Sequence, residues 1–179
     1  MIHRAKFSLI IILFLSSFIS AQKFTSFEVN GNFNFDDSEY LRWSELSINQ
    51  PIYNGILDSV KSKIARNILL QGYYYFGFNG AELITSIDST KFGIILEIDE
   101  GNPVLINNIF IDGIDTTLNI SVIKQFDYLK RQIFIKQEFE LNIEQLLTVF
   151  ENSGYPFAKI IISSVSVFRD SINEENLAD

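Results

Sequence analysis

Residue types that carry much of protein catalysis are missing or rare in this chain of 179 residues. There is no cysteine, and the only histidine is His3. Without cysteine the chain can form no disulfide framework, carries no thiol nucleophile and receives no lipid anchor of the bacterial type. Beyond residue 3 it also lacks the commonest general base and the commonest metal ligand. We therefore expect neither an enzyme nor a bound metal or cofactor.

Carboxylate chemistry is the catalytic route that this composition leaves open. Adjacent acidic residues occur at Asp36-Asp37, Asp99-Glu100 and Glu174-Glu175. Each pair lies in an expected loop or at the end of an expected strand, where solvated acidic residues are ordinary. We interpret all three pairs as surface charge, and an enzyme that uses carboxylates is the last of the functions considered.

Basic residues are also scarce, since 14 Lys and Arg stand against 22 Asp and Glu and give a formal net charge of −8. Arg4 and Lys6 precede an almost wholly apolar run, residues 7–18, and a small-residue cleavage site at 19–21. We therefore expect residues 1–21 to be a signal peptide, whose removal moves the charge from −8 to −10. An acidic exported chain is a poor candidate for binding nucleic acid.

The rest of the chain matches itself at an offset of 82 residues. FEVNG at 27–31 falls on IFIDG at 109–113, and both read as a short alternating strand that ends in glycine. Amphipathic helical patterns at 56–69 and 139–150 also coincide. Each is followed by the same dipeptide, at Gly72-Tyr73 and Gly154-Tyr155. Glycine can adopt the left-handed conformation that ends a helix, and the tyrosine can fold back over the last turn.

Each copy predicts the order strand, short helix, longer helix, strand, strand. In the first copy these elements are expected at 27–31, 36–46, 56–69, 81–87 and 92–99. In the second copy they are expected at 109–113, 118–129, 139–150 and 159–168, before a polar loop at 169–179. Because position 97 in the first copy's final strand falls on 179, we expect the second copy to lack its last strand, and hence the chain to be the N-terminal part of a longer protein.

This order, together with FEVNG, QGYY and LEIDEGNPVLINNIFIDG, resembles the POTRA domain of the BamA/TamA family of outer-membrane protein assembly factors. The resemblance covers residues 24 to about 170. It implies an α+β fold of tandem β-α-α-β-β units, each a three-stranded mixed sheet with two helices on one face. The units would span 22–101 and 102–179, the second incomplete at its C-terminus. The motif positions are Gly31, Gly72, Tyr73, Gly101, Gly113, Gly154 and Tyr155.

The resemblance further implies a periplasmic arm that binds unfolded outer-membrane or exported polypeptides and periplasmic accessory proteins, ahead of a C-terminal β-barrel in the full-length protein. Binding would occur by addition of a client strand to a free sheet edge. In this fold the edge strand lies between the Gly-Tyr pair and the following hairpin loop. The candidate edge residues are Leu83, Ile84 and Thr85 in the first unit and Ile160, Ile161, Ile162, Ser164, Val165 and Val167 in the second.

Other interpretations stay open at this point. The candidate edge residues could instead face their own helices, because an exposed run this apolar would invite aggregation. A POTRA region could also serve a dedicated secretion pore that recognises one substrate. A third possibility is a free secreted adhesion or glycan-binding protein, which the aromatic run at 73–76 would favour if several of its rings were exposed.

Overall fold

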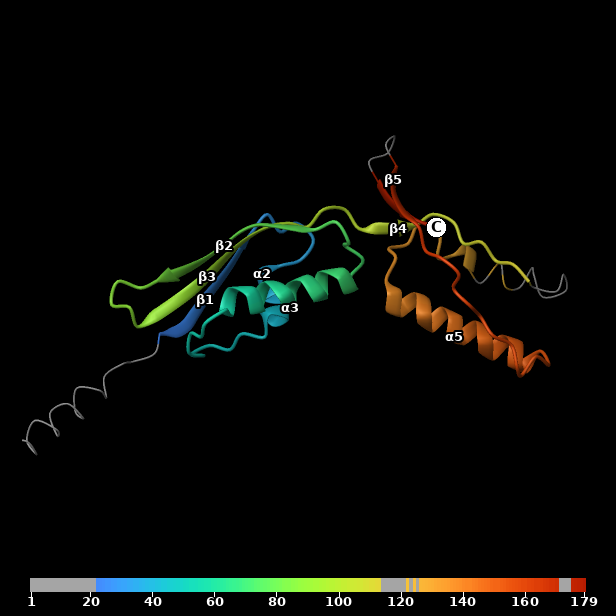
Figure 1. Cartoon of the computed structure of the whole chain (residues 1–179), viewed down its shortest axis with the longest axis horizontal. Helices are drawn as coiled ribbons and strands as arrows, with labels where there is room; N and C mark the ends of the chain where they lie inside the picture. The colour runs from blue at the N-terminus through green and yellow to red at the C-terminus, as the bar shows by residue number, and fades with distance from the viewer. Residues whose placement is uncertain (1–21, 114–121, 123, 125, 171–174) are drawn as a thin grey trace, which may run out of the picture.

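Two three-stranded sheets and three helices make up the part of the chain that the computed structural model describes. The described residues are 22–113, 122, 124, 126–170 and 175–179. The two sheets lie one after the other along the long axis of the molecule, each with its own hydrophobic cluster (Figure 1). The expected signal peptide, residues 1–21, lies outside the described residues.

The first sheet has the strand order β1-β3-β2, so that the last strand of the unit is central. Strand β1 (Lys23–Asn30) pairs in parallel with β3 (Lys91–Asp99), and β2 (Gly77–Thr85) pairs antiparallel with β3. Helices α2 (Asp37–Ser44) and α3 (Ile56–Leu70) cover one face of this sheet (Figure 1). The predicted topology of the first unit is therefore confirmed, with β1 and β2 beginning four residues earlier than expected.

The core between the first sheet and its helices is built from apolar side chains that alternate along β3 and recur with helical spacing along α3. Every second side chain of β3 is buried: Phe92, Ile94, Leu96 and Ile98. Helix α3 buries four side chains that recur every four residues, namely Ile56, Val60, Ile64 and Ile68. These two apolar stripes have the periods of a strand and of a helix, and they pack into one cluster.

Both long helices end with the same hydrogen bonds at the predicted offset. Tyr73 N donates to Ile68 O at 3.3 Å, and Tyr155 N donates to Phe150 O at 2.9 Å. This bond spans six residues and, with the positive φ of the intervening glycine, defines a Schellman-type helix end. Tyr73 then packs into the core, 6% exposed, whereas Tyr155 remains 43% exposed. The ring of Tyr155 still meets that of Phe150 in the last turn of α5, edge to face with centroids 6.4 Å apart. The predicted contact of the ring with the helix end is thus confirmed in both units, and the predicted cover of the core in the first unit.

The second sheet has the equivalent order β4-β6-β5. Strand β4 (Val104–Ile106) pairs in parallel with β6 (Glu175–Ala178), and β5 (Val167–Asp170) pairs antiparallel with β6. Helix α5 (Lys136–Asn152) is the equivalent of α3. The expected short helix at 118–129 lies partly outside the described residues.

The prediction that the second unit lacks its last strand was wrong, because β6 occupies the central position of the sheet. The constant offset failed in the hairpin that precedes this strand. Phe24 pairs with Phe92 in the first sheet, while its repeat partner Ile106 pairs with Ala178. Ala178 is therefore equivalent to Phe92, four residues away from the position that the offset assigns. The polar run that was predicted as a loop forms the longer hairpin β5–β6 instead.

Two strands predicted in the second unit are largely irregular. Only Val167 and Phe168 of the expected strand 159–168 lie in β5, and the expected strand 109–113 is replaced by the shorter, earlier β4. In the first sheet the corresponding strands, β1 and β2, pair with opposite sides of β3 along its full length. In the second unit Ser166 pairs with Asp179 through two hydrogen bonds, and no backbone hydrogen bond joins residues 109–112 or 159–165 to another described residue.

The two units meet where α3 ends. Val104 N donates to Gly72 O at 2.9 Å, and Phe134 N donates to Val104 O at 2.7 Å. The rings of Tyr74 and Phe134 stack with centroids 6.2 Å apart. A β-carbon on Gly72 would lie 3.0 Å from the carbonyl oxygen of Phe134, and its φ is +85°. Glycine is therefore required here both for the helix end and for the close approach of the second unit.

Candidate functional site: the free edge of the first sheet

Strand β2 offers an unpaired edge to solvent. It pairs with β3 on one side, and no described residue pairs with its other side. The opposite edge of the sheet is partly covered, because Phe24 N donates to Gln50 O at 2.8 Å and Asn49 N donates to Phe24 O at 2.9 Å. A short bridge between Lys23 and Pro51 adds to this cover. The open edge of the first unit is therefore that of β2.

The hairpin register shows which backbone groups of β2 face outward. Ser86 N donates to Lys91 O at 3.0 Å, so these residues form a hydrogen-bonded pair. Such pairs alternate with non-hydrogen-bonded ones along an antiparallel ladder. Ile84 therefore points its N–H and C=O groups toward β3, whereas Leu83 and Thr85 point theirs away from the sheet. Two of the predicted edge residues thus present free donors and acceptors to a passing strand.

The side chains at this edge are partly exposed as well. Leu83 is 38% exposed and Ile84 is 48% exposed. Toward the start of β2 the register shifts between Phe78 and Gly80, and such a bulge interrupts pairing. The regular part of the open edge is therefore its second half, where Leu83, Ile84 and Thr85 lie.

The structure does not join the predicted edge residues of the second unit into one strand. Val167 lies in β5, but the others lie in the irregular segment 158–166. Ile160 packs against the second hydrophobic cluster, while Ile161 is 84% exposed and Ile162 is 51% exposed. Ser164 and Val165 are also exposed. The site of the second unit therefore differs from that of the first.

The predicted motif residues lie at turns of the backbone. All five motif glycines have positive φ, namely Gly31, Gly72, Gly101, Gly113 and Gly154. In the aromatic run at 73–76, Tyr73 is buried, Tyr74 stacks on Phe134 and Tyr75 is exposed, while Phe76 is half-buried. Helix-end packing therefore accounts for this run, and it does not form a flat aromatic surface.

Glu100 is a residue whose role the sequence interpretation missed, because it was assigned to surface charge. It is 2% exposed. Its carboxylate accepts from Tyr40 Oη at 2.7 Å, from Asn34 N at 2.7 Å and from Asn34 Nδ2 at 2.8 Å. It also accepts from Phe33 N at 3.1 Å and Phe35 N at 3.3 Å. One signal could have revealed it, since Glu100 continues the alternation of buried residues along β3.

The environment of Glu100 favours its ionised form. Burial by itself would raise the pKa of this carboxyl group, but the hydrogen bonds from Tyr40, Asn34 and Phe33 outweigh burial and lower the pKa below its usual value. Burial and the neighbouring carboxylate raise the pKa of Tyr40, so this hydroxyl stays protonated and donates. The charged carboxylate thus holds the loop that follows β1 against the end of β3.

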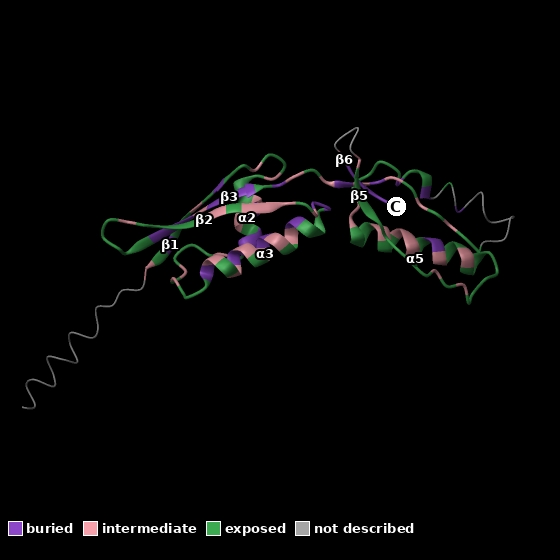
Figure 2. Ribbon diagram, turned by 45° about the horizontal axis from the view of Figure 1, so that its top comes forward, coloured by how far each residue is buried: buried purple, intermediate pink, exposed green. Residues whose placement is uncertain are grey.

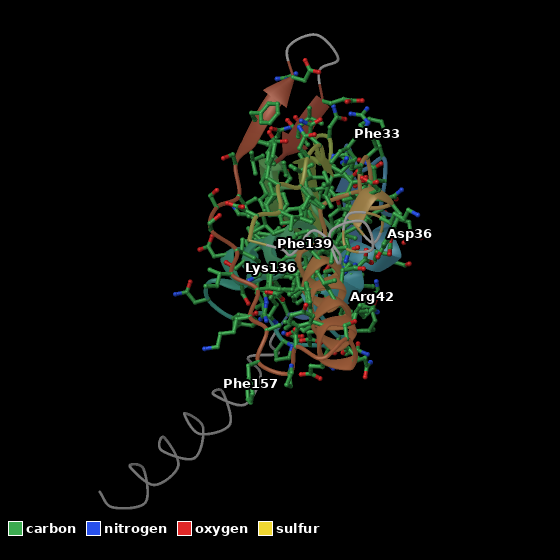
Figure 3. The ribbon with its side chains drawn as sticks, turned by 90° about the vertical axis from the view of Figure 1, so that its right-hand side faces the viewer. Phe33, Asp36, Arg42, Lys136, Phe139 and Phe157 are labelled. Carbon is green, nitrogen blue, oxygen red and sulfur yellow. The ribbon has the colours of Figure 1, made fainter. Side chains whose placement is uncertain are left out.

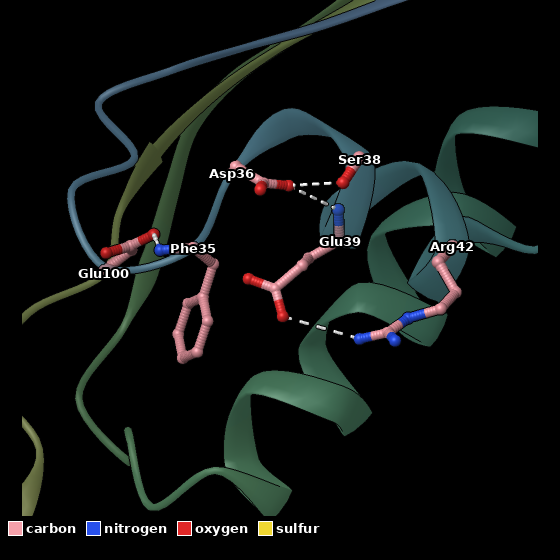
Figure 4. Close-up of polar contacts among 6 residues, drawn as sticks. All are labelled: Phe35, Asp36, Ser38, Glu39, Arg42 and Glu100. Atoms are coloured by element: carbon pink, nitrogen blue, oxygen red, sulfur yellow. Dashed lines mark hydrogen bonds and ion pairs between the residues drawn. The ribbon is translucent and has the colours of Figure 1, made fainter.

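The same loop leads into α2 through a capped start (Figure 4). Asp36 Oδ1 accepts from Glu39 N at 3.0 Å and from Ser38 Oγ at 2.6 Å, as an N-cap residue does. The hydrogen bonds from Ser38 and Glu39 lower the pKa of Asp36. Asp36 therefore has a structural role, as its predicted position at the start of a helix implies.

No group of three or more His, Cys, Asp or Glu side chains that could hold a metal ion occurs in the described residues. Among the same residues, no helix combines the length and the apolar character that a membrane span requires.

Comparison with solved structures shows similarity to POTRA domains 3 to 5 of BamA from Haemophilus influenzae, with a TM-score of 0.53 and 15% identity over 88% of this chain and 64% of that one. BamA from Haemophilus ducreyi lacking POTRA domains 1 to 3 gives a TM-score of 0.49 and 13% identity over 87% and 28%. POTRA domains 1 and 2 of Omp85 from Anabaena give 0.42 and 11% over 88% and 94%. No family model and no curated protein matches the sequence.

The chain has the POTRA fold. The first unit shows the strand and helix order of that fold in full, and the second shows the same sheet order with shorter strands. The chain spans 64% of the length of the Haemophilus influenzae structure that it resembles.

Proposed function

We propose that the chain is the periplasmic POTRA arm of an outer-membrane protein that assembles or translocates other polypeptides. The POTRA fold and the signal-peptide character of residues 1–21 support this proposal. The units span 22–101 and 102–179 in this account, each with its own cluster of apolar side chains. The arm meets unfolded outer-membrane or exported polypeptides, and it contacts periplasmic accessory proteins.

The single observation that carries the binding function is the open edge of β2. Leu83 and Thr85 direct backbone donors and acceptors away from the sheet, and the described part of the chain leaves them without a ladder partner. An extended client segment can pair with these groups through its own backbone, which makes the interaction tolerant of client sequence. Neighbouring exposed side chains, Leu83 and Ile84, add apolar contact on either face of the new strand.

Proline substitution tests this pairing, because proline has no backbone N–H to donate. The double variant Leu83→Pro/Thr85→Pro removes two outward donors and keeps the inward bonds of Ile84. Each hydrogen bond contributes about 1 kcal/mol net, so the dissociation constant for an unfolded outer-membrane protein should rise about 30-fold. The matched control Leu83→Ala/Thr85→Ala shortens the side chains and keeps both donors. Fluorescence anisotropy with a labelled client measures all three affinities.

The comparison of the two double variants decides the result. A large loss in the proline variant with a small loss in the alanine variant is the expected outcome. If both variants bind as the unsubstituted chain does, the edge of β2 is not the binding site. If the alanine variant loses as much affinity as the proline variant, side-chain contacts rather than strand pairing hold the client.

A further inference from the structure

The outer face of the first sheet, which is the face opposite helices α2 and α3, is acidic beside the open edge. Leu83 stands opposite Ile94, which is buried in the core beneath the helices, so Leu83 belongs to the helix face. Successive side chains of a strand point to opposite faces. Glu82 and Ile84 therefore lie on the outer face, where Glu82 stands opposite Ile95. None of the nine residues of β2 is buried, and its last four are exposed (Figure 2).

Two further carboxylates lie on the outer face close to Glu82. Glu28 of β1 stands opposite Ile95 on the other side of this residue. Glu97 of β3 stands opposite Gly80, which places Glu97 diagonal to Glu82. All three glutamates are exposed, and none of them forms an ion pair with another described residue. The outer face therefore carries negative charge that lacks an ion-pair partner in the described part of the chain.

The basic residues of the first sheet lie at its far end. Lys23 pairs with Lys91 where β1 and β3 begin. Lys91 precedes Ile95 by four residues, which is about 13 Å along an extended strand. Charges in solvent that are more than about 8 Å apart are largely screened at physiological ionic strength. The two lysines therefore leave the negative potential around Glu82 largely intact.

A strand added to the open edge brings its side chains closest to Glu82 and Ile84. The backbone groups of Leu83 and Thr85 point outward. An antiparallel client, the slightly more stable arrangement per residue, therefore forms its hydrogen-bonded pairs with these two residues. Glu82 and Ile84 then stand in the non-hydrogen-bonded pairs, in which the Cα atoms are about 4.5 Å apart rather than about 5.5 Å. Side chains on the outer face of the client thus lie directly against these two residues.

A glutamate and an isoleucine side by side suit a long basic side chain. Ile84 is 48% exposed, and the aliphatic stem of lysine or arginine can cover it while the charged head stays in water. A client residue opposite Ile84 is diagonal to Glu82, at a separation of about 7–8 Å that a long side chain can bridge. A client residue opposite Glu82 reaches the carboxylate directly. An acidic side chain at either position would meet a like charge.

The opposite face of the client meets apolar surface. Leu83 lies on the helix face and is 38% exposed, and Ala81 on the same face packs against the first hydrophobic cluster. We propose that the edge of β2 selects client strands that have one aliphatic face and one face bearing lysine or arginine, and that Glu82 sets this preference. The preference rests on the proposed binding of clients at this edge, and it decides which client strands bind best.

Two labelled peptides of about eight residues, the length of a short strand, test this preference by fluorescence anisotropy with the full chain. Both alternate valine with threonine, and the two central threonines are replaced by lysine in one peptide and by glutamate in the other. Cross-strand charge pairs change stability modestly, so the lysine peptide should bind about fivefold more tightly than the glutamate peptide at physiological salt. In about 1 M salt, where the screening length falls to about 3 Å, the two affinities should converge.

Glu82→Lys and Glu28→Lys form a matched pair of variants. Both glutamates are exposed, both stand opposite Ile95, and both substitutions change the net charge equally. Only Glu82 lies on the open edge, whereas Glu28 is three strand spacings of about 4.8 Å, roughly 14 Å in all, from an added strand. Glu82→Lys should therefore invert the preference, so that the glutamate peptide binds about fivefold more tightly. Glu28→Lys should keep the preference for lysine.

Three results would overturn the role of Glu82. They are equal affinities of the two peptides for the unsubstituted chain, equal changes in Glu82→Lys and Glu28→Lys, and undiminished binding of the lysine peptide to the Leu83→Pro/Thr85→Pro chain. If the two affinities are equal but both fall in the proline variant, the proposed edge binding stands and only the charge preference fails. Binding of neither peptide to the unsubstituted chain would overturn the edge binding and the preference together.

Discussion

Replacing Glu100 with alanine tests most sharply how the first unit is held together. The carboxylate collects donors from Tyr40, Asn34 and two further backbone N–H groups of the loop after β1. The loop N–H groups can turn to water when the acceptor is gone. The hydroxyl of Tyr40 cannot, because this side chain is fully buried. The substitution therefore removes hydrogen bonds to a charge and leaves a buried donor unsatisfied.

The expected loss follows from these two contributions. Hydrogen bonds to a charged group contribute about 1.5–3 kcal/mol each, but those in the loop are largely replaced by water. An unsatisfied buried hydroxyl costs a further 1–3 kcal/mol or so. We expect Glu100→Ala to lower the free energy of unfolding of the first unit by about 3 kcal/mol. Tyr40→Phe, which leaves the other donors in place, should cost about 1 kcal/mol.

The chain contains a built-in reporter for this experiment. Trp43 is its only tryptophan, it is 6% exposed, and its ring centroid lies 5.2 Å from that of Tyr40. Urea unfolding followed by tryptophan fluorescence therefore reports on the first core alone. With an m-value of about 2 kcal/mol/M, a loss of 3 kcal/mol moves the midpoint by about 1.5 M.

The double variant separates the orphaned hydroxyl from the remaining loss. In Glu100→Ala/Tyr40→Phe no buried hydroxyl is left without a partner, so the double variant should be more stable than the sum of the single losses predicts by about 1–2 kcal/mol. A Glu100→Ala midpoint within about 0.3 M of the unsubstituted chain would refute this account of the carboxylate, and so would strict additivity of the two substitutions.

Acid should weaken the first unit through Glu100: its folded-state pKa lies below the ordinary 4.5, so its contribution is full above that pH and is lost as the pH falls through the folded pKa. In Glu100→Gln this part of the acid dependence of unfolding should disappear. Gly72→Ala should lower the free energy of unfolding by about 2 kcal/mol and Gly154→Ala by about 1 kcal/mol, measured by circular dichroism in urea. Both glycines have positive φ, but only a β-carbon on Gly72 would meet neighbouring backbone. Equal losses would contradict a close contact between Gly72 and the backbone of Phe134. Asp36→Ala should lower the free energy of unfolding by about 1 kcal/mol, measured by tryptophan fluorescence in urea. Asp36→Ser should retain most of this stability, since serine also caps a helix. An unchanged unfolding midpoint in the alanine variant would exclude a stabilising N-cap hydrogen bond from Glu39 N to Asp36.

The sequence predicts the first unit well because its signals are local and agree with one another. The stripe of α3 has helical period, β3 alternates, and Asp36 occupies a capping position. The start of β2 was missed because glycines at 77 and 80 have little strand propensity, and only pairing with β3 holds them extended. Tertiary pairing thus decided what local propensity could not.

The errors in the second unit have a different physical origin. In the hairpin β5–β6 the apolar residues stand in adjacent pairs, Val167-Phe168 and Leu177-Ala178, so the sequence shows no apolar alternation there. Its central strand also pairs with β4, which lies some seventy residues earlier in the chain. Conversely, the run at 159–165 has strong strand propensity, yet its backbone forms no hydrogen bond to the backbone of another described residue. Strand propensity describes how well a side chain fits into a β-sheet, but it does not tell whether a partner strand is present.

Exposure of single apolar residues also depends on tertiary context. Phe33 and Phe157 are each 91% exposed although phenylalanine is usually a core residue. Figure 3 shows Phe157 beyond the end of α5, projecting from the body of the molecule. Phe33 lies on the loop whose N–H groups are bound by Glu100, so the backbone there is fixed by the carboxylate rather than by burial of the ring.

The most direct test of the central claim is hydrogen exchange of single amides in β2, measured with and without an unfolded outer-membrane protein segment that forms a β-hairpin. If a client adds a strand to this edge, the outward amides of Leu83 and Thr85 slow markedly, while the amide of Ile84, already bonded within the sheet, changes little. A client that binds without slowing Leu83 and Thr85, or that protects only the helices, would contradict the claim.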